Sequence, residues 1–170
     1  MRRAVLSCTL AVLVTAACDT PSPPRSTTID TVVASNAVVV GVVDGDTIDV
    51  DIDGTSERVR LIGIDTPETK KPDTPVECFG PEATAFTIAL LPPGVPVRLE
   101  RDIEGRDAYD RLLAYVFRAT DGLFVNLALV EGGFAVPFPF EPNIAHAAEF
   151  ADAARSADSA SLGLWAECNG

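Results

Sequence analysis

The clearest structural signal in the chain is an alternation of polar and apolar residues. After Asp46, every second residue up to Ile52 is aliphatic, and the residues between are mostly acidic. Successive side chains of a β-strand point to opposite faces, so this pattern predicts a strand with one buried and one solvated face. Asp46 belongs to the buried face, where a carboxylate is costly unless something neutralises it.

A second apolar run, residues 58–64, follows an Asp-Gly pair at positions 53 and 54. Two β-branched runs joined by Asp-Gly predict an antiparallel hairpin. Pairing across that turn would bring Asp46 close to Asp65 and Glu68. Three carboxylates in one small region repel one another, and a divalent cation that prefers oxygen relieves the repulsion. Arg60 adds a fixed cation, and this combination suggests phosphate chemistry with Ca²⁺.

The rest of the chain predicts an α+β fold in a single domain, residues 37–170. The strand count fits a five-stranded β-barrel of OB type with three α-helices. Besides the hairpin, we expect strands at 38–43, 95–101 and 112–118, and helices at 81–91, 125–130 and 144–157.

The N-terminus predicts export from the cytoplasm. Arg2 and Arg3 precede an apolar stretch at 4–17 that is too short to span a bilayer and has the proportions of a signal peptide, residues 1–17. Its end resembles a lipoprotein box with Cys18 as the lipidated residue, which would anchor the protein to a membrane. Ordinary cleavage near Ala17, giving a secreted protein, is the alternative. Residues 18–36 are rich in Pro, Ser and Thr and predict a flexible tether.

Cysteine usage agrees with export. Removal of the signal leaves Cys18, Cys78 and Cys168, an odd number. If Cys18 is lipidated, Cys78 and Cys168 can form one disulfide in an oxidising compartment. Two separate buried thiols are the alternative.

The net charge argues against a general affinity for nucleic acid. The chain carries −12, and loss of Arg2 and Arg3 leaves 11 basic against 25 acidic residues, which is −14. A polyanion is repelled by such a surface, so any phosphate binding must be local.

Four motifs resemble the staphylococcal-type nucleases (thermonucleases), in order and in approximate spacing, from about Val38 to Trp165. They are Val43-Asp-Gly-Asp-Thr47, Arg60-Leu-Ile-Gly-Ile-Asp-Thr-Pro-Glu68, Gly80-Pro-Glu-Ala83 and Asp107-Ala-Tyr-Asp-Arg111. The resemblance implies a five-stranded OB barrel with three helices. It also implies Ca²⁺-dependent hydrolysis of DNA and RNA, with the 5′ P–O bond broken and 3′-phosphate ends left.

The resemblance also assigns roles by position. Asp46 and Asp65 match carboxylate ligands of Ca²⁺, and the backbone carbonyl of Thr66 matches a third ligand. Glu68 matches the residue that acts as general base or orders the attacking water.

Three further positions match groups that contact the substrate. Arg60 and Arg111 match the two catalytic arginines, and Tyr109 matches a tyrosine that hydrogen-bonds the substrate phosphate.

Some positions depart from the family pattern. Phe138 stands where well-known members have a tyrosine, which removes a hydroxyl contact but leaves a ring for base stacking. Asp110 replaces a glycine, and we expect it to repel phosphate or to hold Arg111. His146, the only histidine, falls at a structural position, with Glu100 as a candidate partner.

The sequence thus favours a monomeric, calcium-dependent nuclease of the cell surface or the surrounding medium, with DNA or RNA as substrate. A non-catalytic OB module that binds a ligand or partner at the cell surface is the alternative, and an acidic lipoprotein that merely binds Ca²⁺ is a third. The presence of Arg60, Glu68 and Arg111 together favours the enzyme.

Overall fold

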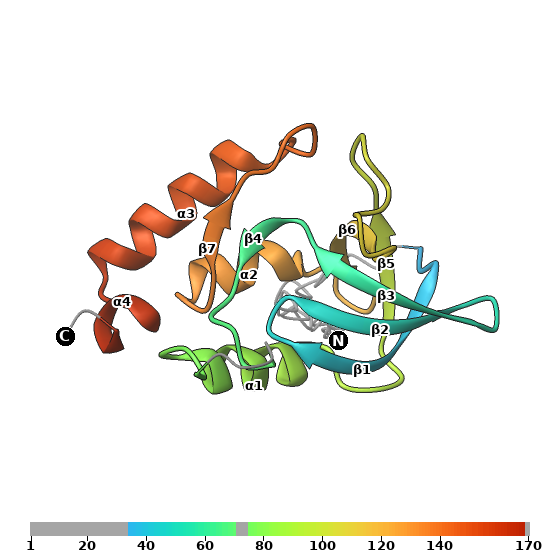
Figure 1. The fold of residues 1–170 in the computed structure, drawn as a ribbon, viewed down its shortest axis with the longest axis horizontal. Helices are drawn as coiled ribbons and strands as arrows, with labels where there is room; N and C mark the ends of the chain where they lie inside the picture. Colours follow the sequence, from blue (N-terminus) through green and yellow to red (C-terminus); the bar gives the residue numbers. More distant parts are fainter. Residues whose placement is uncertain (1–33, 71–74, 169–170) are drawn as a thin grey trace, which may run out of the picture.

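The computed structural model describes residues 34–70 and 75–168, and within them five strands close into a barrel (Figure 1). The strands follow the order β1-β2-β3-β6-β5 around the barrel. They are β1 (Ala37–Asp44), β2 (Thr47–Ile52), β3 (Thr55–Leu61), β5 (Pro96–Glu100) and β6 (Leu112–Arg118). The predicted α+β fold with a closed five-stranded barrel is confirmed. The predicted signal peptide, Cys18 and most of the tether lie outside the described residues.

The β2–β3 hairpin forms as the alternation predicts. Thr47 pairs with Arg60, and Ile52 pairs with Thr55 across the turn. Asp53 and Gly54 both have positive φ, of 52° and 83°, as a tight turn between twisted strands requires. Ile48 and Val50 on the inward face are fully buried. The register therefore places Asp46 directly before β2, beside Leu61 at the end of β3, whose backbone N–H donates to the Asp46 carbonyl oxygen at 2.9 Å.

The second apolar run departs from the prediction, because residues 58–64 do not form one strand. β3 ends at Leu61, and the chain then turns into β4 (Gly63–Asp65), which pairs with β7 (Val136–Phe138) in a separate two-stranded sheet. Gly63 has a φ of 80°, and a Cβ there would lie 2.5 Å from the ring of Phe150. Only glycine meets both demands at this bend. The alternation of residues shows the apolar run but not the bend, which depends on contact with a distant helix.

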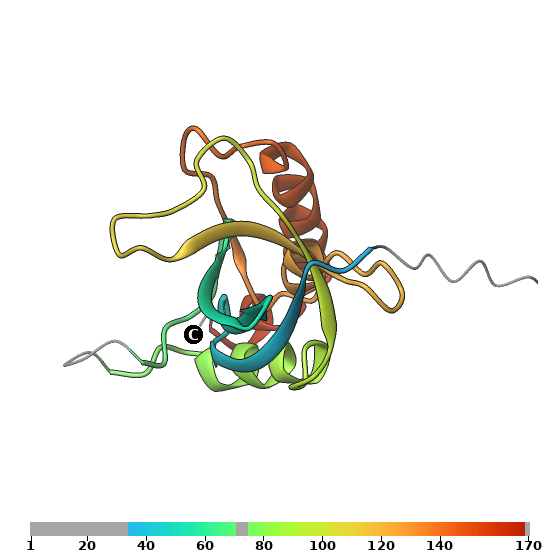
Figure 2. The same cartoon turned by 90° about the vertical axis from the view of Figure 1, so that its right-hand side faces the viewer.

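The three predicted helices are present, and a fourth is added. They are α1 (Gly80–Leu90), α2 (Val125–Glu131), α3 (Ala147–Ser159) and the short α4 (Leu164–Glu167). α3 begins three residues later than expected. In Figure 2, α1 lies below the barrel and α3 lies to one side of it. No helix among residues 34–70 and 75–168 is long and apolar enough to cross a membrane.

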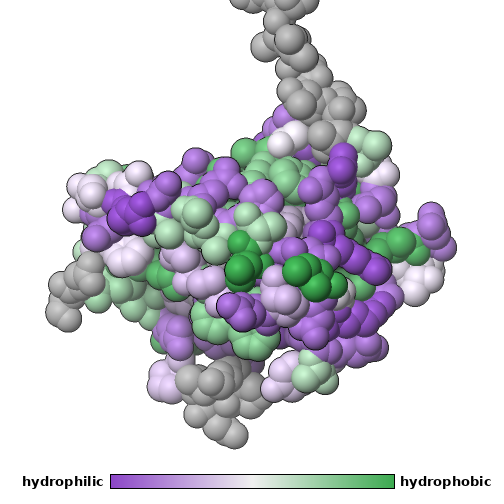
Figure 3. Space-filling view, turned by 90° about the horizontal axis from the view of Figure 1, so that it is seen from above, coloured by the Kyte–Doolittle hydropathy of each residue, from purple (hydrophilic) through white to green (hydrophobic). Residues whose placement is uncertain are grey.

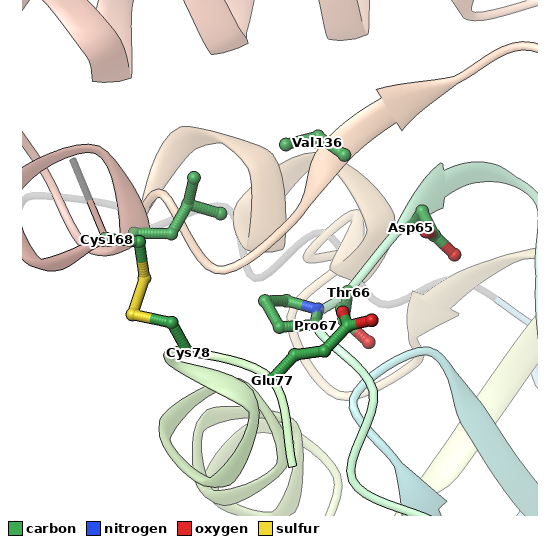
Figure 4. A pocket seen from close by; sticks show the side chains of 8 residues that line it. Asp65, Thr66, Pro67, Glu77, Cys78, Val136 and Cys168 are labelled. Atoms are coloured by element: carbon green, nitrogen blue, oxygen red, sulfur yellow. A yellow bond between two sulfur atoms is a disulfide. The ribbon is translucent and has the colours of Figure 1, made fainter. Parts of the chain in front are cut away.

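Cys78 and Cys168 form a disulfide that joins the segment before α1 to the end of α4. The bond closes a loop with a sequence separation of 90 residues. Figure 4 shows the disulfide at one side of a hollow that Pro67 and Glu77 also line. The disulfide thus ties the C-terminal helix to the segment that follows the hairpin.

His146 has a structural role within an aromatic cluster on the barrel. Its ring centroid lies 4.5 Å from that of Tyr115 and 4.8 Å from that of Phe124. Its Nδ1 lies 2.8 Å from Glu149 Oε2, whereas Glu100 pairs with Arg98. The expected partner Glu100 was therefore wrong, because α3 supplies its own carboxylate three residues along the helix.

Replacement of both bridged cysteines by serine should lower the free energy of unfolding by about 4 to 5 kcal/mol, because the long loop is no longer closed in the unfolded chain. Denaturant unfolding of the wild type and of the C78S/C168S variant measures the difference. Mass analysis of the purified wild type with and without reductant is the control, and two free thiols would contradict the bond.

The alkaline stability of the fold should depend on Tyr115. Burial, together with the hydrogen bond that its hydroxyl donates to Asp102 Oδ2 at 2.9 Å, raises the pKa of Tyr115 to about 12. The folded protein then keeps a proton that the unfolded chain loses from about pH 10 upward. The stabilisation is complete below pH 10 and is lost as the pH rises towards 12.

Tyr109→Phe leaves Tyr115 as the only tyrosine, because the chain has two. The tyrosinate absorbance of this variant should titrate near pH 12, and adding Tyr115→Phe should remove the corresponding fall in stability. A midpoint near 10 would contradict the raised pKa.

Candidate active site

Arg60 occupies the centre of the candidate site, where the hairpin meets β4. Its Nη2 lies 3.0 Å from Asp46 Oδ2 and 2.7 Å from Asp65 Oδ1. Its Nη1 donates to the backbone carbonyl oxygens of Leu61 and Ile64. The side chain is only 14% exposed. One guanidinium thus joins the barrel strands to β4, and it brings together three of the residues that the sequence singled out.

The two carboxylates beside Arg60 converge on one point. Asp46 Oδ2 and Asp65 Oδ1 contact the same nitrogen, Arg60 Nη2, at 3.0 and 2.7 Å. The separation of these two oxygens therefore cannot exceed the sum of the two distances. Asp46 is also fixed by the backbone N–H of Thr66, which donates to Oδ2 at 3.1 Å. Asp46, Asp65 and Thr66 therefore lie side by side, as the hairpin interpretation requires.

The electrostatic balance of this region is negative. Burial raises the pKa of Asp65, and the charges of Asp46, Glu77 and Glu68 raise it further, although Arg60 opposes them. The neighbouring carboxylates thus add to the effect of burial, and Asp46, Asp65, Glu68 and Glu77 together outnumber the single guanidinium of Arg60.

Oxygen donors with an excess of negative charge suit a hard cation such as Ca²⁺. The hydroxyl of Thr66 adds a buried oxygen that has no hydrogen-bond partner. In the described part of the chain, no group of three or more His, Cys, Asp or Glu side chains is arranged to hold a metal ion. Arg60 holds the position between the two carboxylates instead. The donor set fits the cation, provided that Arg60 leaves this position.

Glu68 lies at the base of the loop after β4. Its carboxylate accepts a hydrogen bond from the backbone N–H of Lys70 at 2.7 Å. The backbone N–H of Glu68 donates to Glu77 Oε2, and that of Glu77 donates to the Glu68 carbonyl, both at 3.0 Å. Glu68 is thus held by its own loop.

Asp44 is a member of the site that the sequence did not single out. Its carboxylate accepts hydrogen bonds from Thr69 Oγ1 at 2.6 Å and from Thr84 Oγ1 at 2.9 Å. Burial alone would raise the pKa of Asp44, but hydrogen bonding with the side chains of Glu68, Thr69 and Thr84 holds it below its ordinary value. In the sequence, the only indication of this role is the position of Asp44 at the start of the Asp-Gly-Asp turn. Only the fold shows that it ties α1 to the Glu68 loop.

The second half of the site comes from the loop between β5 and β6. Asp107 Oδ2 accepts from Arg111 Nε at 2.7 Å, and its Oδ1 accepts from the backbone N–H groups of Tyr109 and Arg111, both at 2.9 Å. Although burial opposes it, these hydrogen bonds hold the pKa of Asp107 below its ordinary value. Tyr109 is 83% exposed, and its ring centroid lies 5.6 Å from Arg111 Cζ. The loop presents a tyrosine and an arginine together.

Asp110 does not hold Arg111, contrary to one of the two expectations for it. Its carboxylate lies 3.6 Å from Arg106 Nη1, and Asp107 is the partner of Arg111. Asp110 has a φ of 64°, in the left-handed region that glycine adopts without strain. A glycine would meet this backbone requirement without strain.

A cleft of about 530 Å³ brings the two halves of the site together. Arg60 lies on one side of it and Tyr109 and Arg111 on another, with Phe138 and Phe140 exposed among the lining residues. Figure 3 looks onto the upper side of the molecule of Figure 1, where separate apolar groups lie among mostly hydrophilic residues. Two guanidinium groups, a phenol and exposed rings can bind a phosphate next to a flat ring.

A smaller hollow of about 310 Å³ lies against Asp65 and Thr66. Figure 4 shows the disulfide at one side of it and the carboxylate side chains of Asp65 and Glu77 at another. Since Asp65 contacts Arg60, the two hollows meet at the Arg60–Asp65 ion pair.

Comparison with known proteins identifies the family. Residues 58–167 match the family described as Staphylococcal nuclease homologue. The chain is 44% identical over 128 residues to a thermonuclease of Staphylococcus intermedius, covering 75% of this chain and 74% of that protein. It is 40% identical over 127 residues to the thermonuclease of Staphylococcus hyicus, covering 75% and 73%.

A third relative is the SPbeta prophage-derived endonuclease YokF of Bacillus subtilis (strain 168). It is 40% identical over 127 residues, which cover 74% of this chain and 42% of that protein. The fold, with its closed five-stranded barrel, is the α+β OB fold. The chain belongs to the staphylococcal nuclease family.

Proposed function

We propose that this protein is a Ca²⁺-dependent nuclease that hydrolyses phosphodiester bonds of DNA, RNA or both outside the cytoplasm. One observation carries the proposal: Arg60 and Arg111, from distant parts of the chain, line a single cleft together with Tyr109. The names of the relatives, thermonuclease and endonuclease, describe the same activity.

The metal would be held by the carboxylates of Asp46 and Asp65 and by the backbone carbonyl of Thr66. When bound, Ca²⁺ supplies positive charge that stabilises the negative charge developing on the phosphate. Arg60 pairs with both carboxylates in this structure. In the proposed function its guanidinium would bind phosphate oxygens of the substrate in their place.

The arginines provide the main stabilisation from the protein itself. Attack of water on a phosphodiester builds charge on the non-bridging oxygens, and a planar guanidinium can donate to two oxygens at once. Arginine also stays charged at all relevant pH values, unlike a lysine whose pKa falls on burial. Arg60 is oriented by the Leu61 and Ile64 carbonyls, and Arg111 by Asp107.

Glu68 would accept the proton of the attacking water or orient that water, and Tyr109 would donate its hydroxyl hydrogen to a phosphate oxygen. The family resemblance implies cleavage of the 5′ P–O bond with a 3′-phosphate product. Asp44 supports the loop of Glu68, because its carboxylate accepts a hydrogen bond from the neighbouring Thr69 hydroxyl.

The location follows from the N-terminal signal, with either a lipid on Cys18 or free secretion. The Cys78–Cys168 disulfide supports an oxidising compartment. We expect a monomer. The charge of −14 in the mature chain implies that substrate binding depends on the cleft rather than on the surface as a whole. A non-catalytic binding module would not need Arg60, Glu68 and Arg111 together.

Purified protein should cleave denatured DNA with Ca²⁺ and stop when a chelator is added. Arg60→Ala, Glu68→Ala and Arg111→Ala should each lower the rate by about a thousandfold or more, because each removes transition-state stabilisation or proton acceptance. Release of acid-soluble nucleotides measures the rate.

Arg98→Ala is the matched control, since Arg98 pairs with Glu100 on β5 and does not line the cleft. Near-normal turnover in any of the three variants would overturn the role of that residue, and an inactive, folded wild type would overturn the enzyme.

Ca²⁺ should also raise the melting temperature of the wild type, because a ligand that binds only the folded state stabilises it. At a hundredfold excess over Kd the gain is about 2.7 kcal/mol. Asp46→Ala and Asp65→Ala should lose the shift, and Asp49→Ala, on the solvated face of β2, should keep it. Equal shifts in all four proteins would contradict the assigned ligands.

A further inference from the structure

Arg106 connects two elements that carry the proposed catalytic arginines. Its Nη2 lies 2.8 Å from Glu57 Oε1, and its Nη1 lies 3.0 Å from Glu57 Oε2, so the ion pair is bidentate. The same Nη1 donates to the backbone carbonyl of Asp110 at 2.7 Å. Glu57 belongs to β3, three residues before Arg60, and Asp110 directly precedes Arg111.

The peptide unit between Asp110 and Arg111 is held at both ends. Arg106 binds its carbonyl oxygen, and Asp107 Oδ1 accepts its N–H at 2.9 Å. A non-glycine residue in the left-handed region persists only where its surroundings hold it, and Asp110 is such a residue. Release of one end would let this peptide rotate and carry the base of the Arg111 side chain with it.

Arg106 lines the cleft, but its two terminal nitrogens face protein oxygens. The hydrogen bond from Arg106 holds the pKa of Glu57 below its ordinary value, so Glu57 is charged at neutral pH. Asp107 already fixes Arg111 within its own loop, whereas Arg106 ties that loop to the barrel strand that carries Arg60.

We propose that Glu57 and Arg106 are positioning residues that set the separation of Arg60 and Arg111 across the cleft. This proposal rests on the proposed function, in which the two arginines bind one phosphate together. Neither residue needs to touch the substrate. The pair acts by restricting where the β5–β6 loop, which stands above the barrel in Figure 1, can place Arg111.

Misplacement by about 1 Å can cost a hundredfold in rate. Because the loop keeps its Asp107 hydrogen bonds, we expect Glu57→Gln and Arg106→Gln to lower kcat by about tenfold. The change in KM should be smaller than about threefold, since the arginines act most strongly in the transition state. Arg106→Lys should behave like Arg106→Gln, because an ammonium group cannot form the bidentate ion pair with Glu57 and also donate to the Asp110 carbonyl.

Asp49→Asn is the matched control. Asp49 in β2 forms a bidentate ion pair with Arg58 in β3, at 2.8 and 3.1 Å, and this pair does not involve the β5–β6 loop. This variant should keep the kcat of the wild type. Normal kcat in Arg106→Lys would show that the positive charge alone is sufficient, and it would overturn the role of the bidentate geometry.

Amide hydrogen exchange tests whether Glu57 and Arg106 restrain the β5–β6 loop, and it does not depend on catalytic activity. The Arg111 N–H should exchange about tenfold faster in Glu57→Gln and Arg106→Gln than in Asp49→Asn. Unchanged exchange at this amide, or a kcat within about twofold of the control, would overturn the proposal. An inactive wild type would overturn the proposed function instead, and the exchange rates would still decide whether Glu57 and Arg106 restrain the loop.

Discussion

The ion pairs of Arg60 with Asp46 and Asp65 hold the two parts of the fold in register. Asp46 directly precedes β2, Arg60 lies in β3 and Asp65 ends β4, so a single guanidinium connects the barrel to the small second sheet. Burying a charge without a partner costs free energy. Removing one member of a buried ion pair is therefore destabilising, because the other charge stays buried and uncompensated. The same three groups are the proposed metal and phosphate ligands. Stability and chemistry therefore compete for the same side chains.

The bend at Gly63 explains how the cleft arises. A strand that continued to residue 64 would have stayed in the barrel wall. Instead the chain leaves the barrel, packs against Phe150 of α3 and pairs with β7. This pairing brings Phe138 beside the strand that follows Arg60. The aromatic rings and the acidic cluster thus lie on opposite ends of one short, two-stranded sheet.

An acidic protein can hold a polyanion only where its positive groups are concentrated. Here Arg60 is paired with Asp65 and Arg111 with Asp107, and these carboxylates keep both guanidinium groups oriented while substrate is absent. In the proposed function, phosphate oxygens would replace carboxylates as partners of Arg60 and Arg111, and Asp46 and Asp65 would hold Ca²⁺. The Cys78–Cys168 bond borders the acidic side of the site and restrains the segment that carries Glu77.

The sequence by itself predicted the barrel, from the strand count and the family motifs. It also predicted the hairpin with Asp46, Arg60, Asp65 and Glu68 close to one another, because alternation and turn residues act locally. It also indicated the cysteine pair by counting. Tertiary structure alone decided that the run 58–64 bends, that Asp44 supports the Glu68 loop, and that Arg106 joins β3 to the loop of Arg111. Those features depend on contacts between residues many positions apart, such as Gly63 with Phe150 and Glu57 with Arg106. Local patterns carry no information about which distant side chain will fill a given space or meet a given charge.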